Sequence, residues 1–128
     1  MNTTGFRGAV FALVAGLQCA CGSDSPTPPS NTPDAATTIT ITRNGATPRT
    51  LTVPRGSQIT FINQDTTVHQ MYSDPHPEHT DCPEFDSVGQ LSPGSSRQTA
   101  NLVAPRTCNF HDHLNFFNTT LRGSIVIQ

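Results

Sequence analysis

Charged side chains are scarce in this sequence. Only 12% of its 128 residues are Asp, Glu, Lys or Arg, and the formal net charge is -2. A surface that binds nucleic acid needs a cluster of positive charge, so the composition argues against a nucleic-acid partner. The chain length corresponds to one small domain with a short extension, which excludes a multidomain machine.

Long hydrophobic runs are missing as well. The apolar run at residues 8–17 follows Arg7 and is much shorter than the ~20 residues that a membrane-spanning helix needs. Such a run is typical of a secretory signal peptide. It ends in Gln18-Cys19-Ala20-Cys21, which resembles a bacterial lipoprotein signal, where a cysteine after small residues is lipidated. We predict a signal peptide over residues 1–21 with lipidation at Cys21; lipidation at Cys19 and plain cleavage are the alternatives.

No apolar residue lies between Ser23 and Asp34, in the segment that follows the signal. Residues 22–36 are rich in proline and serine, a composition that favours an extended, solvated tether. The tether would join a membrane-attached lipid to a domain at residues 37–128. We therefore expect an exported protein, a periplasmic or cell-surface lipoprotein of a bacterium.

The rest of the chain is patterned as strands and turns. Hydrophobic residues make up only 34% of the sequence, which contains 11 prolines and 9 glycines. Threonine and isoleucine alternate strictly over residues 38–42, and such alternation is typical of a half-buried strand. About seven strands are expected, at residues 38–42, 50–53, 58–63, 68–72, 97–103, 107–111 and 123–128. Short strands at this spacing predict an all-β fold, a β-sandwich with Greek-key connections.

Two of the four cysteines belong to this domain. Cys82 and Cys108 form its only cysteine pair, and disulfides persist in exported compartments. We predict a bridge between them. It would pin the long segment at residues 73–96, which has few apolar residues of its own.

Three consecutive features carry a resemblance to a known family. Residues 51–69 are similar to a strand, a glycine turn and a second strand that leads to a metal-binding histidine, His69. Residues 91–95 are similar to the turn of a later hairpin. Residues 104–127 are similar to a ligand-bearing strand, its loop and a final strand. In this order and spacing they resemble the cupredoxins, the plastocyanin and azurin family of small copper-binding β-sandwiches.

The resemblance also implies that the usual copper centre is altered. It places Cys108 inward and Asp112 where the family has its copper cysteine. The second copper histidine would fall at Asn115 and the axial methionine at Leu121, so that His69 alone is retained. A blue-copper centre needs a cysteine thiolate and two imidazoles, and in this register such a centre cannot form.

All five histidines lie in two segments, residues 69–79 and 111–113. Imidazole and carboxylate together suit copper, zinc or another divalent ion. In a strand, His111 and His113 share one face and Asp112 takes the other. The predicted metal ligands are His69, His111, Asp112 and His113, with His76 and His79 as further candidates.

Three functions follow from these patterns. The first is an exported, membrane-tethered domain that binds copper or another divalent metal for storage or delivery. The alternative is a blue-copper-type electron carrier, because Cys108 and His111 have the Cys-X-X-His spacing; it requires that Cys108 stay unbridged and join His69 at the copper. A metal-free interaction module is the third. No nucleophile is paired with a base in the sequence, so an enzyme is not expected.

Overall fold

The computed structural model describes residues 35–128. The predicted signal peptide, Cys21 and nearly all of the predicted tether lie outside the described residues. Within residues 35–128, no helix is both long enough and apolar enough to cross a membrane.

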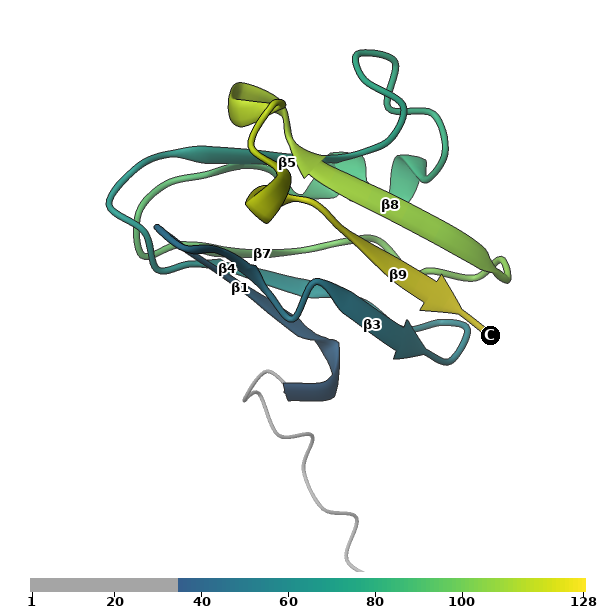
Figure 1. Cartoon of the computed structure of the whole chain (residues 1–128). Coiled ribbons are helices and arrows are strands. Elements are labelled where there is room, and N and C mark those ends of the chain that lie inside the picture. Colours follow the sequence, from purple (N-terminus) through teal and green to yellow (C-terminus); the bar gives the residue numbers. More distant parts are fainter. Residues whose placement is uncertain (1–34) are drawn as a thin grey trace, which may run out of the picture.

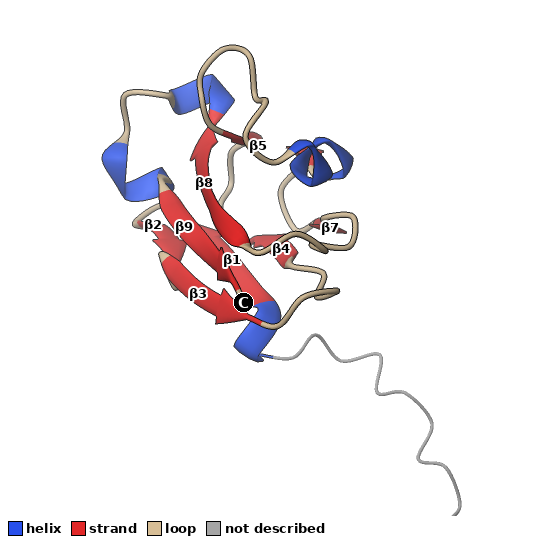
Figure 2. Cartoon of the chain, turned by 90° about the vertical axis from the view of Figure 1, so that its right-hand side faces the viewer, coloured by secondary structure: helices blue, strands red, loops and turns tan. Residues whose placement is uncertain are grey.

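Nine strands form two sheets that face each other (Figures 1 and 2). The four-stranded sheet has the order β2 (Gly45–Thr47), β1 (Thr38–Thr42), β4 (Thr60–Asn63) and β7 (Ser96–Gln98). The five-stranded sheet has the order β3 (Thr50–Val53), β9 (Gly123–Ile127), β8 (Arg106–Asp112), β5 (His69–Ser73) and β6 (Gly89–Leu91). Both sheets are mixed, because β1 pairs with β4 and β3 with β9 in parallel while the other pairs are antiparallel.

Short 3-10 helices complete the described part of the chain. They are η1 (Ala35–Thr37), η2 (Pro83–Ser87), η3 (His113–Asn115) and η4 (Thr119–Leu121). The all-β sandwich predicted from the sequence is confirmed. All seven expected strands are present, but the strand expected at residues 97–103 is limited to β7, and two more strands, β2 and β6, were not predicted. Both additional strands have three residues, too few to display an alternating pattern.

The core lies between the two sheets and follows the alternation of the strands. Ile39 and Ile41 of β1 are fully buried, while the threonines between them are half-buried. The ring of Phe61 on β4 packs edge-on against Phe110 on β8, with centroids 5.4 Å apart. Burial of such side chains is the main stabilising contribution in a domain of this size, and it fixes the position of β8.

The predicted disulfide is confirmed between Cys82 and Cys108, with their Cα atoms 5.8 Å apart. Arg106 adds a second contact between β8 and the segment that follows Cys82, because its guanidinium donates a hydrogen bond to Glu84 Oε1 at 2.7 Å. Cys108 lies in the middle of β8, and Cys82 ends the loop that follows β5. We call residues 74–82 the histidine loop; its far end is therefore covalently attached to β8, the strand that carries His111.

Candidate metal centre

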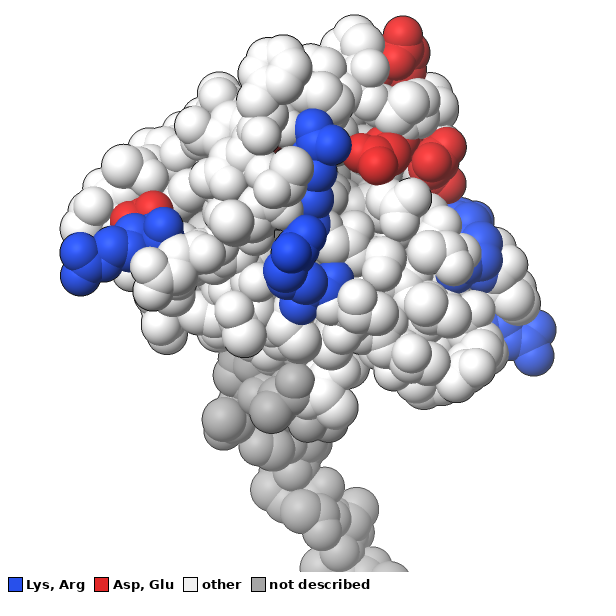
Figure 3. Space-filling view, viewed as in Figure 1, with Lys and Arg blue, Asp and Glu red and all other residues white. Residues whose placement is uncertain are grey.

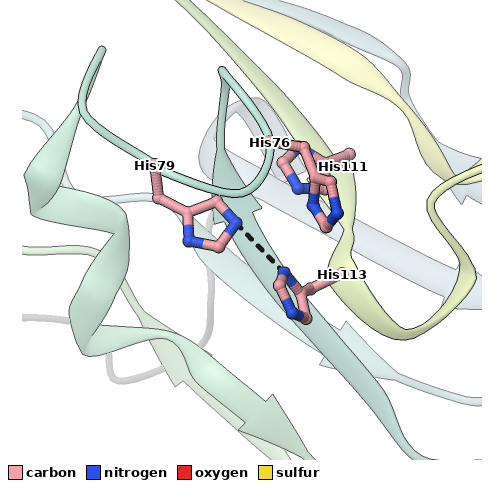
Figure 4. Close-up of side chains that lie close together, drawn as sticks. All are labelled: His76, His79, His111 and His113. Carbon is pink, nitrogen blue, oxygen red and sulfur yellow. Dashed lines mark hydrogen bonds between the residues drawn. The ribbon is translucent and has the colours of Figure 1, made fainter.

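Four histidines from two distant parts of the sequence converge at one end of the five-stranded sheet (Figure 4). They are His76 and His79 from the histidine loop, His111 from β8, and His113 from the start of η3. One ring nitrogen of each lies within 4.8 Å of the others. His113 Nδ1 and His79 Nε2 are 3.1 Å apart and share a hydrogen bond. We call these four residues the histidine cluster.

The loop histidines are brought over β8 by strand pairing. Strand β5 pairs with β8 so that Tyr72 lies opposite His111. The backbone N–H of Asp74 then donates to the carbonyl oxygen of Asn109 at 3.1 Å, which starts the histidine loop beside β8. His79 has a left-handed backbone conformation with φ of 56°, a region that is uncommon outside glycine and is often found at functional sites.

Asp74 orients the buried member of the cluster. His111 is 0% exposed, and its Nδ1 lies 2.6 Å from Asp74 Oδ1. A carboxylate accepts hydrogen bonds, so Nδ1 carries the proton and Nε2 keeps a free lone pair. His111 Nε2 is buried and has no hydrogen-bond partner. A carboxylate behind a histidine is the arrangement that typically fixes metal-binding imidazoles.

Aromatic rings hold two further members of the cluster. The ring of His76 stacks on Phe116 with centroids 4.2 Å apart, and the guanidinium of Arg122 covers Phe116 at 4.1 Å. The ring of His79 stacks on Tyr72 at 4.4 Å. His76 Nδ1 is a second buried nitrogen without a hydrogen-bond partner. The rings are thus held in place before any ligand is bound.

The surroundings favour the neutral form of two imidazoles in the cluster, those of His79 and His111. Burial lowers the pKa of His79, and the neighbouring rings of His111 and His113 lower it further. Burial also lowers the pKa of His111, and the hydrogen bond that His111 donates to Asp74 opposes that shift. A neutral imidazole is the form that binds metal, so these pKa shifts leave the rings ready to act as ligands.

His69 and Asp112 lie apart from the histidine cluster, on the inward side of the sheet. Their side chains contact each other directly, with His69 Nδ1 2.8 Å from Asp112 Oδ2. The carboxylate of Asp112 also accepts hydrogen bonds from the backbone N–H groups of Gln70 and Leu114 and from the amide of Asn115. The other ring nitrogen of His69 is 3.2 Å from Asp65 Oδ2. Hydrogen bonds within the protein therefore occupy the polar atoms of both residues.

The structure divides the ligand set predicted from the sequence. It brings His111 and His113 together with His76 and His79, and it does not bring His69 or Asp112 to them. The physical reason is strand alternation, which places Asp112 on the opposite face from its two histidine neighbours. Asp74 was not identified from the sequence as part of this site. Its position directly after a strand that pairs with β8 was the available signal.

The electron-carrier alternative requires a correction. It needed an unbridged Cys108 that could join His69 and His111 at one copper ion. Cys108 is bridged to Cys82, and a disulfide sulfur offers no thiolate. His69 and His111 also have separate partners, Asp112 and Asp74. The thiolate site of that alternative is therefore not formed.

Asp112→Asn tests whether the buried carboxylate is structural. The substitution removes the charge that His69 and three other donors contact, and we expect the free energy of unfolding to fall by about 1–3 kcal/mol. Urea unfolding measures this change, and metal titration of the same variant is expected to match the unsubstituted protein within about twofold. A large loss of metal affinity with unchanged stability would instead make Asp112 a ligand.

Comparisons with known proteins agree on the fold. No protein-family model matches the sequence, and no curated protein gives a sequence match. Among solved structures, a purple cupredoxin from Nitrosopumilus maritimus matches with a TM-score of 0.55 and 14% identity, covering 71% of this chain and 98% of that one. A plastocyanin from Dryopteris crassirhizoma matches with a TM-score of 0.55 and 18% identity, covering 71% and 99%. A Cu(I) structure of an amicyanin variant has a TM-score of 0.55 and 18% identity, covering 80% and 97%. At these identities the similarity concerns the fold alone.

Proposed function

We propose that this cupredoxin-like domain binds copper or another divalent metal ion through the histidine cluster, for binding, storage or delivery of the ion. The carrying observation is that two buried ring nitrogens, His76 Nδ1 and His111 Nε2, have no hydrogen-bond partner. Leaving such an atom buried and unpaired costs about 1–3 kcal/mol. A metal ion accepts lone pairs from both, so its binding would remove this cost.

The spacing of the histidine cluster is compatible with one ion. Imidazole nitrogens bind zinc at ~2.0–2.1 Å, so two nitrogens on a tetrahedral ion are ~3.4 Å apart. The four candidate nitrogens lie within 4.8 Å of one another. An inward shift of each nitrogen by up to about 1 Å, within the range of side-chain motion, would gather all four. The hydrogen bond between His79 and His113 would be replaced by bonds to the ion.

The donor set points to a particular class of metal. Four imidazoles without a thiolate or thioether suit Cu(II), Zn(II) or a similar borderline ion rather than Ca²⁺ or Mg²⁺, which prefer oxygen ligands. Asp74 adds one negative charge directly behind His111. The carboxylate both fixes the ring and partly neutralises the ion. Copper is our first candidate because the fold is that of copper proteins such as the amicyanin variant in its Cu(I) form.

The position of the cupredoxin copper centre does not fit a metal in this chain. The residues there, His69, Asp112 and Asn115, are hydrogen-bonded to one another. None of the three offers a thiolate, and none of their buried side-chain nitrogen or oxygen atoms lacks a hydrogen-bond partner. The proposed metal is therefore held on the other side of β8, and a role in binding or delivery is better supported than blue-copper electron transfer.

The proposal includes an exported location. The disulfide between Cys82 and Cys108 supports an oxidising compartment such as the periplasm or the cell surface. The sequence pattern around Cys21 supports attachment to a membrane through lipid. The metal ion is the partner that the described residues favour, and we propose no catalytic activity.

Calorimetric titration with Cu(II) and Zn(II) tests the proposed function. We expect one ion per chain. The same titration after carbethoxylation of the histidines is expected to show no binding. Absence of saturable binding by either ion in the untreated protein would contradict the proposal.

Asp74→Ala is expected to weaken metal binding without removing any proposed ligand. Loss of the carboxylate behind His111 frees its tautomer and ring orientation, and outer-shell losses of this kind typically reduce affinity by about 10–100-fold. Competition with a coloured chelator measures the change. The matched control is Asp81→Ala, an exposed carboxylate in the same loop, which is expected to leave the affinity unchanged. Equal affinities for both variants would show that Asp74 does not support the site.

A further inference from the structure

Beside the histidine cluster, an open depression of about 490 Å³ crosses the ends of β3, β8 and β9. Its polar lining comes from Arg49, Thr50, Asp74, Asn109, Arg122 and Ser124. Figure 3 shows basic side chains gathered near the middle of the face on which β9 and β3 lie in Figure 1. We call this depression the arginine pocket.

Both arginines of the pocket are held in place by backbone carbonyls. Arg49 Nε donates to the carbonyl oxygen of Arg122 at 2.9 Å, and its Nη2 donates to that of Thr119 at 2.9 Å. Arg122 Nε donates to the carbonyl oxygen of Phe116 at 3.0 Å, and its guanidinium lies over the Phe116 ring. Much of the conformational entropy of two long side chains has therefore been lost already, which favours ligand binding.

In the described part of the chain, no ion pair with a carboxylate neutralises the two arginines of the arginine pocket. Within residues 35–128, neither Arg49 nor Arg122 forms an ion pair with a carboxylate, whereas Arg106 does with Glu84. Asp74 contributes one negative charge to the lining, but its carboxylate accepts a hydrogen bond from His111. A guanidinium carries more N–H donors than these backbone contacts use. Donors on two fixed cations thus remain for a ligand.

Two hydroxyl groups and a glycine complete the lining of the arginine pocket. Thr50 Oγ1 and Ser124 Oγ lie 3.4 Å apart on the paired strands β3 and β9. Between them and β8 lies Gly123, where a Cβ atom would clash with the carbonyl oxygen of Arg49 and with the ring of Phe110. Only glycine fits at this position, because Arg49 and Phe110 pack closely against its α carbon and so fix β9 beside the pocket. The hydroxyls and arginines of the pocket are donors suited to an oxyanion.

We propose that the arginine pocket binds a phosphate-type oxyanion, either inorganic phosphate or the phosphate of an anionic lipid headgroup. Guanidinium groups match the geometry of phosphate oxygens and form paired, charge-assisted hydrogen bonds with them. The pocket shares Asp74 with the metal centre, and its Arg122 covers the Phe116 ring that stacks on His76. None of the four proposed metal ligands lines the pocket, so oxyanion binding does not require the metal. A membrane-attached protein would meet both sources of phosphate.

Two titrations of the full-length protein test this proposal. In the first, NMR spectra of ¹⁵N-labelled protein are recorded with inorganic phosphate at constant ionic strength. In the second, sedimentation measures binding to vesicles of phosphatidylglycerol, with phosphatidylcholine vesicles as the uncharged comparison. Arg49→Gln and Arg122→Gln are each expected to weaken binding by about tenfold, since each removes charge-assisted hydrogen bonds. Arg97→Gln, on the exposed strand β7, is the matched control.

The outcomes distinguish binding of free phosphate, binding of a lipid headgroup and the absence of binding. Saturable shifts of the amides of Gly123 and Ser124 with phosphate, and no vesicle binding, would assign a free oxyanion. Arginine-dependent binding to the anionic vesicles would assign a lipid headgroup. If the unsubstituted protein shows neither saturable shifts with phosphate nor binding to the anionic vesicles, the proposal is overturned, whether or not the variants fold. Because no metal is added, failure here leaves the metal-binding proposal intact.

Discussion

Replacing His76 and His79 together with alanine is expected to abolish stoichiometric metal binding, with affinity reduced by more than about 100-fold. The double substitution leaves only His111 and His113 of the histidine cluster. Two imidazoles do not provide the four donors that zinc and Cu(II) sites usually have. Both substituted residues lie in the histidine loop, outside the strands, so the sandwich is expected to fold. Calorimetric titration with Cu(II) and Zn(II) measures the effect.

His69→Gln is the matched control for the double substitution. His69 is buried against Asp112, so its replacement is expected to lower stability while leaving one metal site per chain. If His69→Gln abolished metal binding and the double variant retained it, the ion would belong with His69 and Asp112. That outcome would restore the ligand grouping expected from the sequence.

Removing the disulfide is expected to lower the free energy of unfolding by about 3 kcal/mol. The bond between Cys82 and Cys108 spans 26 residues, and a loop of that length restricts the unfolded chain by roughly this amount. The double variant Cys82→Ser, Cys108→Ser keeps the buried positions small and leaves no unpaired thiol among residues 35–128. Urea unfolding followed by circular dichroism measures the loss of stability.

The same variant has a second expected effect. Cys82 anchors the end of the histidine loop to β8, so without the bond the loop histidines gain freedom and metal affinity falls. Adding a reducing agent to the unsubstituted protein should reproduce both changes, and adding it to the double variant should change nothing. A loss of less than about 1 kcal/mol in the double variant would show that the disulfide contributes little to the native state.

Much of the fold could be predicted from local patterns. The alternation of threonine and isoleucine in β1 gives the correct strand and the correct buried face, because a strand places successive side chains on opposite sides. The same argument correctly places Cys108, Phe110 and Asp112 inward on β8. Strands β2 and β6 could not be predicted, because three residues at the edge of a sheet show no periodicity and depend on their neighbours for pairing.

The candidate site was only partly predictable, for a related reason. The spacing of His111 and His113 shows that they share a face, and the structure agrees. Which other residues join them depends on the path of the histidine loop, which is set by pairing between β5 and β8 and by the disulfide. Contacts between segments so far apart in the sequence leave no local pattern. His76 and His79 were therefore candidates only, and Asp74 was missed.

The most direct test of the account is electron paramagnetic resonance of the protein loaded with one equivalent of Cu(II), recorded together with its visible absorption spectrum. Coordination by the histidine cluster predicts hyperfine couplings from imidazole nitrogens, a large copper hyperfine splitting and only weak visible absorption. An intense blue band with a small copper splitting would show thiolate coordination. That result would contradict both the disulfide and the assignment of the metal to His76, His79, His111 and His113.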